Sequence, residues 1–398
     1  MQVSIPAQLN VKSLQVYSGD DQTSFPLILN SSESSGFITI EFDVQSNSYP
    51  ELSIYFRFCD RNWNPVNNTF LLNRGNEIVP FIDFVKLHVT ITGAQYHYKS
   101  SFPNNNGYIN FPFSGKWMFF VTAVNDTSKI YAKGRFIVAE NLIDLNIKSD
   151  TEIRSDKYYS PSDLAKSFIF DIGFNLPFEF FPQNVIATEI IENQKIFYPT
   201  VITKDKKNSY SEFYWDGNRN FNFIAKGITP GNEYRLANLK QYTNFNLKEV
   251  YAQRDRIETS RFYKRGTKDL NGGFILSDYN DVYSDYLNVR FTIRPPDPFY
   301  SDIYLSGAFN NWIIDDKYKM GNSDGLFTLT IPLKRGIYDY LYVTKNGDEI
   351  DWNFLEGNLF ETSHIYRVFI FYNDPSFGGY DRIIGYSTIN MNNKNGKN

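Results

Sequence analysis

Apolar and polar residues alternate with a period of two along much of this chain. Clean examples are residues 36–44, 116–124 and 289–294. Between residues 302 and 343 three such segments follow one another, with turn residues 322–325 and 334–336 between them. A period of two places side chains alternately on the two faces of a β-strand. Short strands of this kind, separated by turns, predict an all-β protein.

The aromatic content and the length refine this prediction. Phe, Tyr and Trp make up 18% of the 398 residues, and such side chains are enriched in strands. The length suffices for two or three domains. We therefore predict tandem immunoglobulin-like or early-set β-sandwiches. The expected boundaries are 1–140 for an N-terminal sandwich, 141–284 for a middle β-rich domain, 285–388 for a C-terminal early-set-like sandwich with a closing strand at 366–372, and 389–398 for a disordered tail.

Charge and cysteine usage exclude several classes of protein. The formal net charge is -4 and 21% of residues are charged, so the sequence predicts no nucleic-acid partner. Cys59 is the single cysteine, which excludes an intramolecular disulfide. No His or basic pocket is implied beside it, so Cys59 is interpreted as a structural thiol.

The sequence also contains no evident membrane or export signal. No apolar run reaches the roughly 18 residues that span a bilayer. Residues 1–4 have neither the basic nor the apolar region of a secretory leader. The residues alone leave two alternatives, a cytosolic protein or an exported one whose leader is missing from this sequence.

Patterns of catalytic or metal-binding residues are weak. The chain has three histidines, and no nucleophile elbow, zinc motif or phosphate-binding loop accompanies them. His88 falls on the polar side of its segment and is predicted to be solvated. Residues 216–220 imitate the start of a calcium loop, but Phe221 and Gly227 stand where Gly and Glu are required. We predict no catalytic residue, no metal and no cofactor, and we do not expect an enzyme.

One segment has a more specific local pattern. Gly307 to Trp312 reads G-A-F-N-N-W, and Gly336 to Tyr340 reads G-I-Y-D-Y. Both resemble signatures of the early-set β-sandwiches that bind glycogen and starch. The Lys that follows the second Tyr in those modules is Leu341 here, and their second Trp is displaced to Trp352. The residues expected of the sugar site are therefore incomplete. Two interpretations stay open for Asn310, Asn311 and Trp312. These residues either contact a ligand or partner, or they form a structural turn.

Taken whole, the chain resembles the plug proteins of the type IX secretion system of Gram-negative bacteria. Four segments in the right order carry the resemblance: Cys59 to Pro65 (C-D-x-x-W-x-P), Tyr96 to Asn104 with its F-P-N turn, Phe113 to Trp117, and Gly231 to Arg235 (G-N-E-Y-R). The resemblance implies a non-enzymatic protein of the periplasm that docks on the periplasmic opening of the giant outer-membrane translocon β-barrel and seals its pore. It also implies a secretory leader that is absent from this sequence, and an association with the outer membrane through the partner alone.

Two other function classes are carried as alternatives. The early-set pattern favours a carbohydrate-binding β-sandwich protein, although the departures make carbohydrate an unlikely partner. Scattered acidic residues are the sole support for a hydrolase with an appended sandwich.

Candidate contacts follow from expected exposure and side-chain chemistry. Aromatic side chains supply anchoring area at interfaces, and amides satisfy the partner's polar groups. Trp63 lies on a predicted turn, where exposure is expected. Residues 254–269 carry six cations against three anions and form a candidate interaction loop. The predicted contacts to a partner or ligand are Trp63, Asn310, Asn311, Trp312, Arg261, Lys264 and Arg265.

Overall fold

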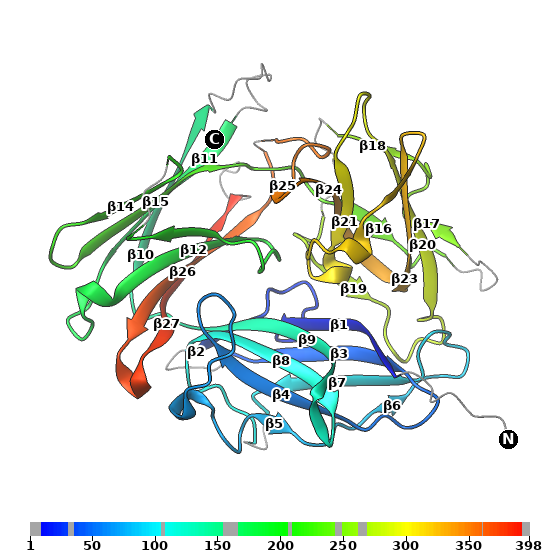
Figure 1. The fold of residues 1–398 in the computed structure, drawn as a ribbon, viewed down its shortest axis with the longest axis horizontal. Helices are drawn as coiled ribbons and strands as arrows, with labels where there is room; N and C mark the ends of the chain where they lie inside the picture. Colours follow the sequence, from blue (N-terminus) through cyan, green and yellow to red (C-terminus); the bar gives the residue numbers. More distant parts are fainter. Residues whose placement is uncertain are drawn as a thin grey trace.

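The structure is a computed structural model that describes residues 9–30, 36–104, 108–153, 166–205, 209–242, 249–261, 269–359 and 361–391. Within these residues the regular structure consists of strands and short 3₁₀ turns, which confirms the predicted all-β class. Six sheets form three sandwiches, and Figure 1 shows the first of them below the other two. The 3₁₀ turns are η1 (Thr69–Leu71), η2 (Pro182–Asn184), η3 (Ala308–Asn310), η4 (Asp316–Tyr318) and η5 (Ser376–Gly378).

The first sandwich is formed by the first 140 residues or so of the chain. One sheet has the order β1-β3-β7-β6, and the other has the order β2-β9-β8-β4-β5. Rings such as Phe56, Trp117 and Phe136 pack edge-on or stacked between the two sheets. The strands predicted at 36–44 and 116–124 are confirmed as β3 and β8. The bounds are β1 (Asn10–Ser18), β2 (Leu27–Asn30), β3 (Ile38–Gln45), β4 (Leu52–Cys59), β5 (Ile78–Val79), β6 (Val85–Lys86), β7 (Tyr96–Phe102), β8 (Gly115–Ala123) and β9 (Asp126–Glu140).

The second sandwich combines the middle of the chain with its end. The sheet β10-β11-β15-β14 faces the sheet β13-β12-β26-β27. Phe170 of the former and Val368 and Ile370 of the latter belong to one buried core. The bounds are β10 (Leu145–Ile153), β11 (Lys166–Asn175), β12 (Val185–Glu192), β13 (Thr200–Thr203), β14 (Ser211–Trp215), β15 (Asn220–Ile228), β26 (Ile365–Asp374) and β27 (Tyr380–Asn390).

The third sandwich contains the segment that shows three successive alternating stretches. In one sheet β24 pairs with β16, β19, β21 and β25, and in the other β20 pairs with β17, β18 and β23, which pairs with β22. Phe291 of β20 and Tyr340 of β24 meet edge-to-face in the core between them. The bounds are β16 (Arg235–Asn238), β17 (Val250–Tyr251), β18 (Glu258–Thr259), β19 (Phe274–Leu276), β20 (Tyr286–Arg294), β21 (Asp302–Gly307), β22 (Gly321–Ser323), β23 (Leu326–Lys334), β24 (Gly336–Asn346) and β25 (Glu349–Asp351).

Strand pairing crosses the boundary predicted at residues 284 and 285. β16 and β19 precede that boundary in the sequence but pair with β24 of the third sandwich. The strand expected at 366–372 is β26, and it does not close the third sandwich, because it pairs with β12 and β27 of the second. The prediction that residues 366–372 close the third sandwich is therefore wrong. An alternating pattern indicates which side chains share a face of a strand, but it does not indicate which strand pairs with it. The predicted tail also starts too early, since β27 continues to Asn390, and residues 392–398 lie outside the described part.

The three sandwiches share extensive buried interfaces. Between the first and second, Cys59 and Met118 pack with Phe369 and Phe371 of β26. Between the first and third, the polar face of β3 is covered rather than solvated, because Asp43 is buried against Lys334 at 2.9 Å. Among the described residues, no helix combines the length and apolar character needed to cross a bilayer.

Candidate functional site

The segment Gly231–Arg235 is the centre of a buried polar junction between the second and third sandwiches. The side-chain amide of Asn232 donates to the carbonyl of Glu356 at 2.8 Å. The hydroxyl of Tyr234 donates to Oε1 of Glu192, the last residue of β12, at 2.9 Å. The segment therefore joins the end of a second-sandwich strand to the loop that follows β25.

Charged side chains continue this junction into the third sandwich. Glu356 accepts hydrogen bonds of 2.9 Å from Nε of Arg235 and from Nε of Arg261. Arg235 also contacts Glu258 at 2.7 Å, and all four side chains are buried. Burial raises the pKa of Glu356, but the charges of Arg235 and Arg261 outweigh it, so the net pKa is lowered. A buried carboxylate held between two guanidinium groups fixes the surrounding loops in place.

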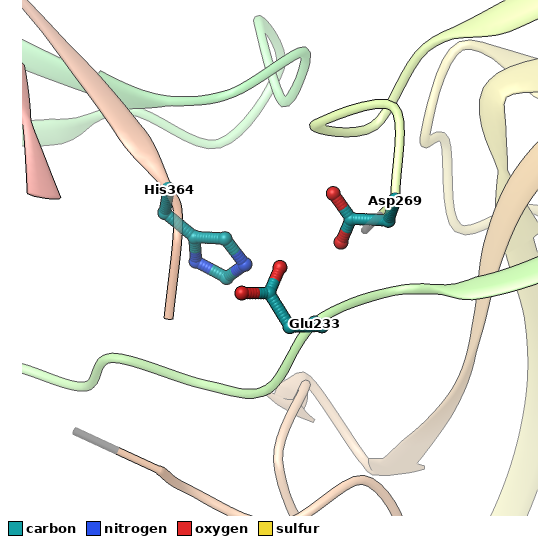
Figure 2. A group of neighbouring side chains, drawn as sticks. All are labelled: Glu233, Asp269 and His364. Atoms are coloured by element: carbon teal, nitrogen blue, oxygen red, sulfur yellow. The ribbon is translucent and has the colours of Figure 1, made fainter. Parts of the chain in front are cut away.

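Next to this network lies a cluster of two acids and a histidine. Figure 2 shows the carboxylate of Glu233 between the ring of His364 and the carboxylate of Asp269. Glu233 accepts hydrogen bonds of 2.8 Å from both the amide and the hydroxyl of Ser363. Asp269 accepts from the amides of Tyr234 and Asn271. One potential ligand atom from each of the three side chains lies within 4.8 Å of the others.

The electrostatics of the cluster favour one additional positive charge. Burial and the neighbouring Glu233 raise the pKa of Asp269 to about 7. Burial and the charge of Asp269 also raise the pKa of Asp339 well above its usual value. Burial lowers the pKa of His364, which favours a neutral ring. A proton on Asp269 relieves the repulsion between the two acids, and one imidazole nitrogen with two carboxylate oxygens is also a donor set that divalent metals accept.

Access limits what the cluster can do chemically. Glu233, Asp269 and His364 are each at most 4% exposed. A substrate would reach them only if the second and third sandwiches moved apart. In the arrangement described here, the hydrogen bonds of the cluster connect the segments of the junction to one another.

The two tryptophans predicted as contacts are buried. Trp63 is 8% exposed and packs in the interface between the first and second sandwiches, where the ammonium of Lys116 lies 4.9 Å from its ring centroid. The expected exposure of Trp63 is therefore wrong, because the second sandwich covers its turn. Trp312 is 1% exposed, and its Nε1 donates to the carbonyl of Gly272 at 2.8 Å.

The two asparagines before Trp312 form a structural turn. Asn310 is buried, and its Oδ1 accepts from the amide of Gly307 at 3.0 Å. Asn311 and Trp312 follow with left-handed backbone angles, φ of 53° and 62°. Of the two interpretations left open by the sequence, the turn is the one that these contacts support. Asn311 is partly exposed and is the member of the group that keeps an accessible side chain.

The predicted basic loop is described only in part. Arg261 is buried and donates from Nη2 to the carbonyl of Glu233 at 2.7 Å, so its side chain serves the junction. Lys264 and Arg265 lie outside the described residues. The prediction that these two contact a partner stays a prediction.

Sequence reasoning missed the Glu233–Asp269–His364 cluster. Glu233 belongs to the G-N-E-Y-R segment, which was the one indication in the sequence that this residue matters. That segment supported the family resemblance but did not predict a site. Asp269 and His364 stand alone in the sequence, 95 positions apart. They meet only because the chain enters the second sandwich again at β26.

Tandem β-sandwiches joined through buried polar junctions define the class of this protein. Comparison with protein families makes the class more specific: residues 11–140 match the model described as "Type 9 secretion system plug protein 1st domain". This match supports the resemblance to type IX secretion plug proteins and covers the first sandwich. The early-set resemblance of the C-terminal part finds no such support.

A solved structure has the same fold. It is described as a hypothetical protein from Parabacteroides merdae ATCC 43184, and it is 22% identical with a TM-score of 0.74. The alignment covers 98% of this chain and 100% of that chain, so the arrangement of all three sandwiches is shared. No curated protein matches the chain.

Proposed function

We propose that this chain is a non-enzymatic plug of the type IX secretion system. In this proposal it works in the periplasm, docks on the periplasmic opening of the outer-membrane translocon barrel and closes its pore. The match of residues 11–140 to the first domain of type 9 secretion system plug proteins is the observation that carries the proposal. The mechanism is steric, so it requires a rigid body and a docking surface but no reacting group.

Rigidity is supported by the ion pairs buried between the sandwiches. Lys116 of the first sandwich lies 2.7 Å from Glu189 of the second, and Lys334 of the third lies 2.9 Å from Asp43 of the first. Separating the sandwiches would expose these charges and the apolar side chains around them. A plug assembled in this way resists deformation when the pore is closed.

A docking surface is suggested by two exposed aromatic residues on neighbouring turns. Phe70 on η1 is 70% exposed, and Phe377 on η5 is 51% exposed. The side chain of Asn68 donates to the carbonyl of Phe377 at 2.6 Å, which holds η1 of the first sandwich against η5 of the second. Exposed aromatic side chains on ordered turns are typical anchors of protein interfaces. We call this surface the Phe70–Phe377 edge and propose that it contacts the barrel.

The proposal is tested in the bacterium that produces the protein. Deletion of the gene should make the outer membrane permeable to large hydrophilic probes, and the wild-type gene supplied in trans should restore the barrier. The tagged protein, isolated from detergent-solubilised envelopes, should retain one very large outer-membrane barrel. Unchanged permeability together with a protein that purifies alone would refute the plug function.

The carbohydrate alternative loses its main support. A tryptophan that stacks on a sugar must present a ring face to solvent, whereas Trp312 is buried with its indole nitrogen bonded to Gly272. Affinity electrophoresis on soluble glycogen and starch should show equal mobility with and without the polysaccharide.

A further inference from the structure

An apolar pocket lies where all three sandwiches meet. Its volume is about 310 Å³. Leu14 and Arg135 line it from the first sandwich, Phe197 from the second, and Phe274 and Ile313 from the third. Ligand pockets in proteins are mainly apolar, hold a few polar groups and often occur at domain interfaces. This pocket meets each of these conditions and lies at the lower end of the usual range of roughly 300–1,000 Å³.

Arg135 is the polar group that distinguishes the pocket. Its guanidinium carbon lies 3.9 Å from the ring centroid of Phe197 and 4.6 Å from that of Trp63. Within the described part of the chain, no carboxylate forms an ion pair with it. Burial lowers the pKa of Arg135 to about 10, so the side chain is still a cation at neutral pH. A partly buried cation of this kind is often paired with an anion, and here two aromatic rings lie against it instead.

The remaining charges around the pocket leave a positive balance. Lys133 and Arg135 line it as cations, and Asp315 lines it as the acid. The Asp315 carboxylate is already engaged, because it accepts from the amide of Lys317 at the start of η4 at 2.8 Å. The guanidinium of Arg135 can therefore offer its donors to a ligand without competition from a fixed partner.

We propose that this pocket binds a small organic anion with an apolar body, whose carboxylate pairs with Arg135. The apolar part of the ligand lies against Leu14, Phe274 and Ile313. The planar guanidinium suits a carboxylate, which it can bind through two parallel hydrogen bonds. The pocket is a binding site with no reacting group, and the proposal is independent of the plug function.

Ligand binding should stabilise the arrangement of the three sandwiches. A molecule in the pocket touches walls from each of them, so it binds the assembled form and not the separated one. Binding to the folded form alone raises the unfolding temperature with ligand concentration.

The test uses the full chain and two probes of matched length, decanoate and decanol, below their aggregation concentrations. Isothermal titration calorimetry and thermal unfolding measure binding. We expect decanoate to bind and raise the unfolding temperature, and Arg135→Met to weaken decanoate roughly tenfold or more while decanol binding is unchanged. Lys133→Met on the same strand is the matched control and should change decanoate binding much less.

A second variant guards against loss of folding in the first. Ile313→Trp fills the pocket without touching a charge, so it should abolish binding of both probes while circular dichroism stays native. Three results would each overturn the proposal: no binding of decanoate, equal affinity for decanoate and decanol, or equal effects of Arg135→Met and Lys133→Met.

Discussion

The ammonium of Lys116 lies 2.7 Å from a carboxylate oxygen of Glu189, and both side chains are 2% exposed. The two residues belong to β8 and β12, so the pair joins the first sandwich to the second. Burial lowers the pKa of Lys116 and raises the pKa of Glu189, although each residue partly offsets the shift of the other. Both shifts favour the neutral forms, so the cost of burying the two charges exceeds the attraction between them. Each charge is therefore tolerated in the interface only while the other is present.

Removing one member of this pair should therefore be costly. We expect Lys116→Met to lower the free energy of unfolding by about 3–5 kcal/mol, because Glu189 is left buried with only the longer contact of 3.6 Å to the partly exposed Arg61. The double variant Lys116→Met with Glu189→Leu should recover most of that loss. Urea unfolding followed by circular dichroism measures both effects.

The exposed pair Lys319 and Asp302 is the matched control for this prediction. Its nitrogen and oxygen are also 2.7 Å apart, but the side chains are 45% and 52% exposed. Lys319→Met should leave the unfolding curve almost unchanged, because water and salt screen exposed pairs. Equal losses for the buried and exposed pairs would contradict the desolvation argument.

Asp269 should make stability depend on pH. Its pKa is raised from 3.8 to about 7 in the folded state by burial and by Glu233. The folded protein therefore keeps a proton that the unfolded chain loses, and the stability present below about pH 4 is lost as pH rises toward 7. A shift of this size corresponds to at most about 4 kcal/mol above pH 7.

Asp269→Asn removes this titration while keeping the side-chain shape. The variant should gain stability relative to the wild type between pH 5 and 8, with chemical unfolding measured at each pH. Asp302→Asn, at an exposed acid, serves as the control and should follow the wild type. If Asp269→Asn and the wild type give parallel curves, the buried cluster does not bind its proton at Asp269.

Cys59 should be unreactive in the folded protein. Burial raises the pKa of its thiol to about 12, so almost no thiolate exists at neutral pH. A thiol-specific disulfide reagent at pH 8 should label Cys59 only slowly in buffer and rapidly in 6 M urea. Ser323→Cys provides an exposed thiol on β22, and it should react at once under both conditions. Rapid native labelling of Cys59 would mean that the first and second sandwiches separate readily.

The sequence predicts individual strands better than it predicts their partners. The alternation at 36–44 and 116–124 locates β3 and β8, because burial between two sheets imposes a period of two. It cannot show that the polar side of β3 is covered as well, since Asp43 is buried by Lys334 of the distant third sandwich. Trp63 is misjudged for the same reason, because a turn is exposed only if nothing packs over it.

The buried junction is harder to predict than the strands. The residues that build it come from distant segments, as with Glu233 and His364, and no spacing rule connects them. The early-set pattern around Trp312 is similarly ambiguous, because one set of residues can form a sugar platform or a closed turn. The contact with Gly272 decides between these outcomes, and a contact across about 40 positions leaves no local trace.

The Phe70–Phe377 edge gives the sharpest prediction about the partner. If it contacts the barrel, Phe70→Ser and Phe377→Ser should each weaken binding to the detergent-solubilised barrel by roughly tenfold or more, because exposed aromatic anchors dominate such interfaces. Unfolding free energy should change little for Phe70→Ser, since that ring is 70% exposed, and more for Phe377→Ser, because the Phe377 ring also packs against Phe113. Biolayer interferometry with the immobilised plug measures the affinity. Tyr300→Ser is the control, because Tyr300 is 92% exposed between β20 and β21 of the third sandwich, whereas η1 and η5 belong to the first and second. If Tyr300→Ser weakens binding while the two Phe variants do not, docking takes place on the third sandwich and the proposed edge is wrong.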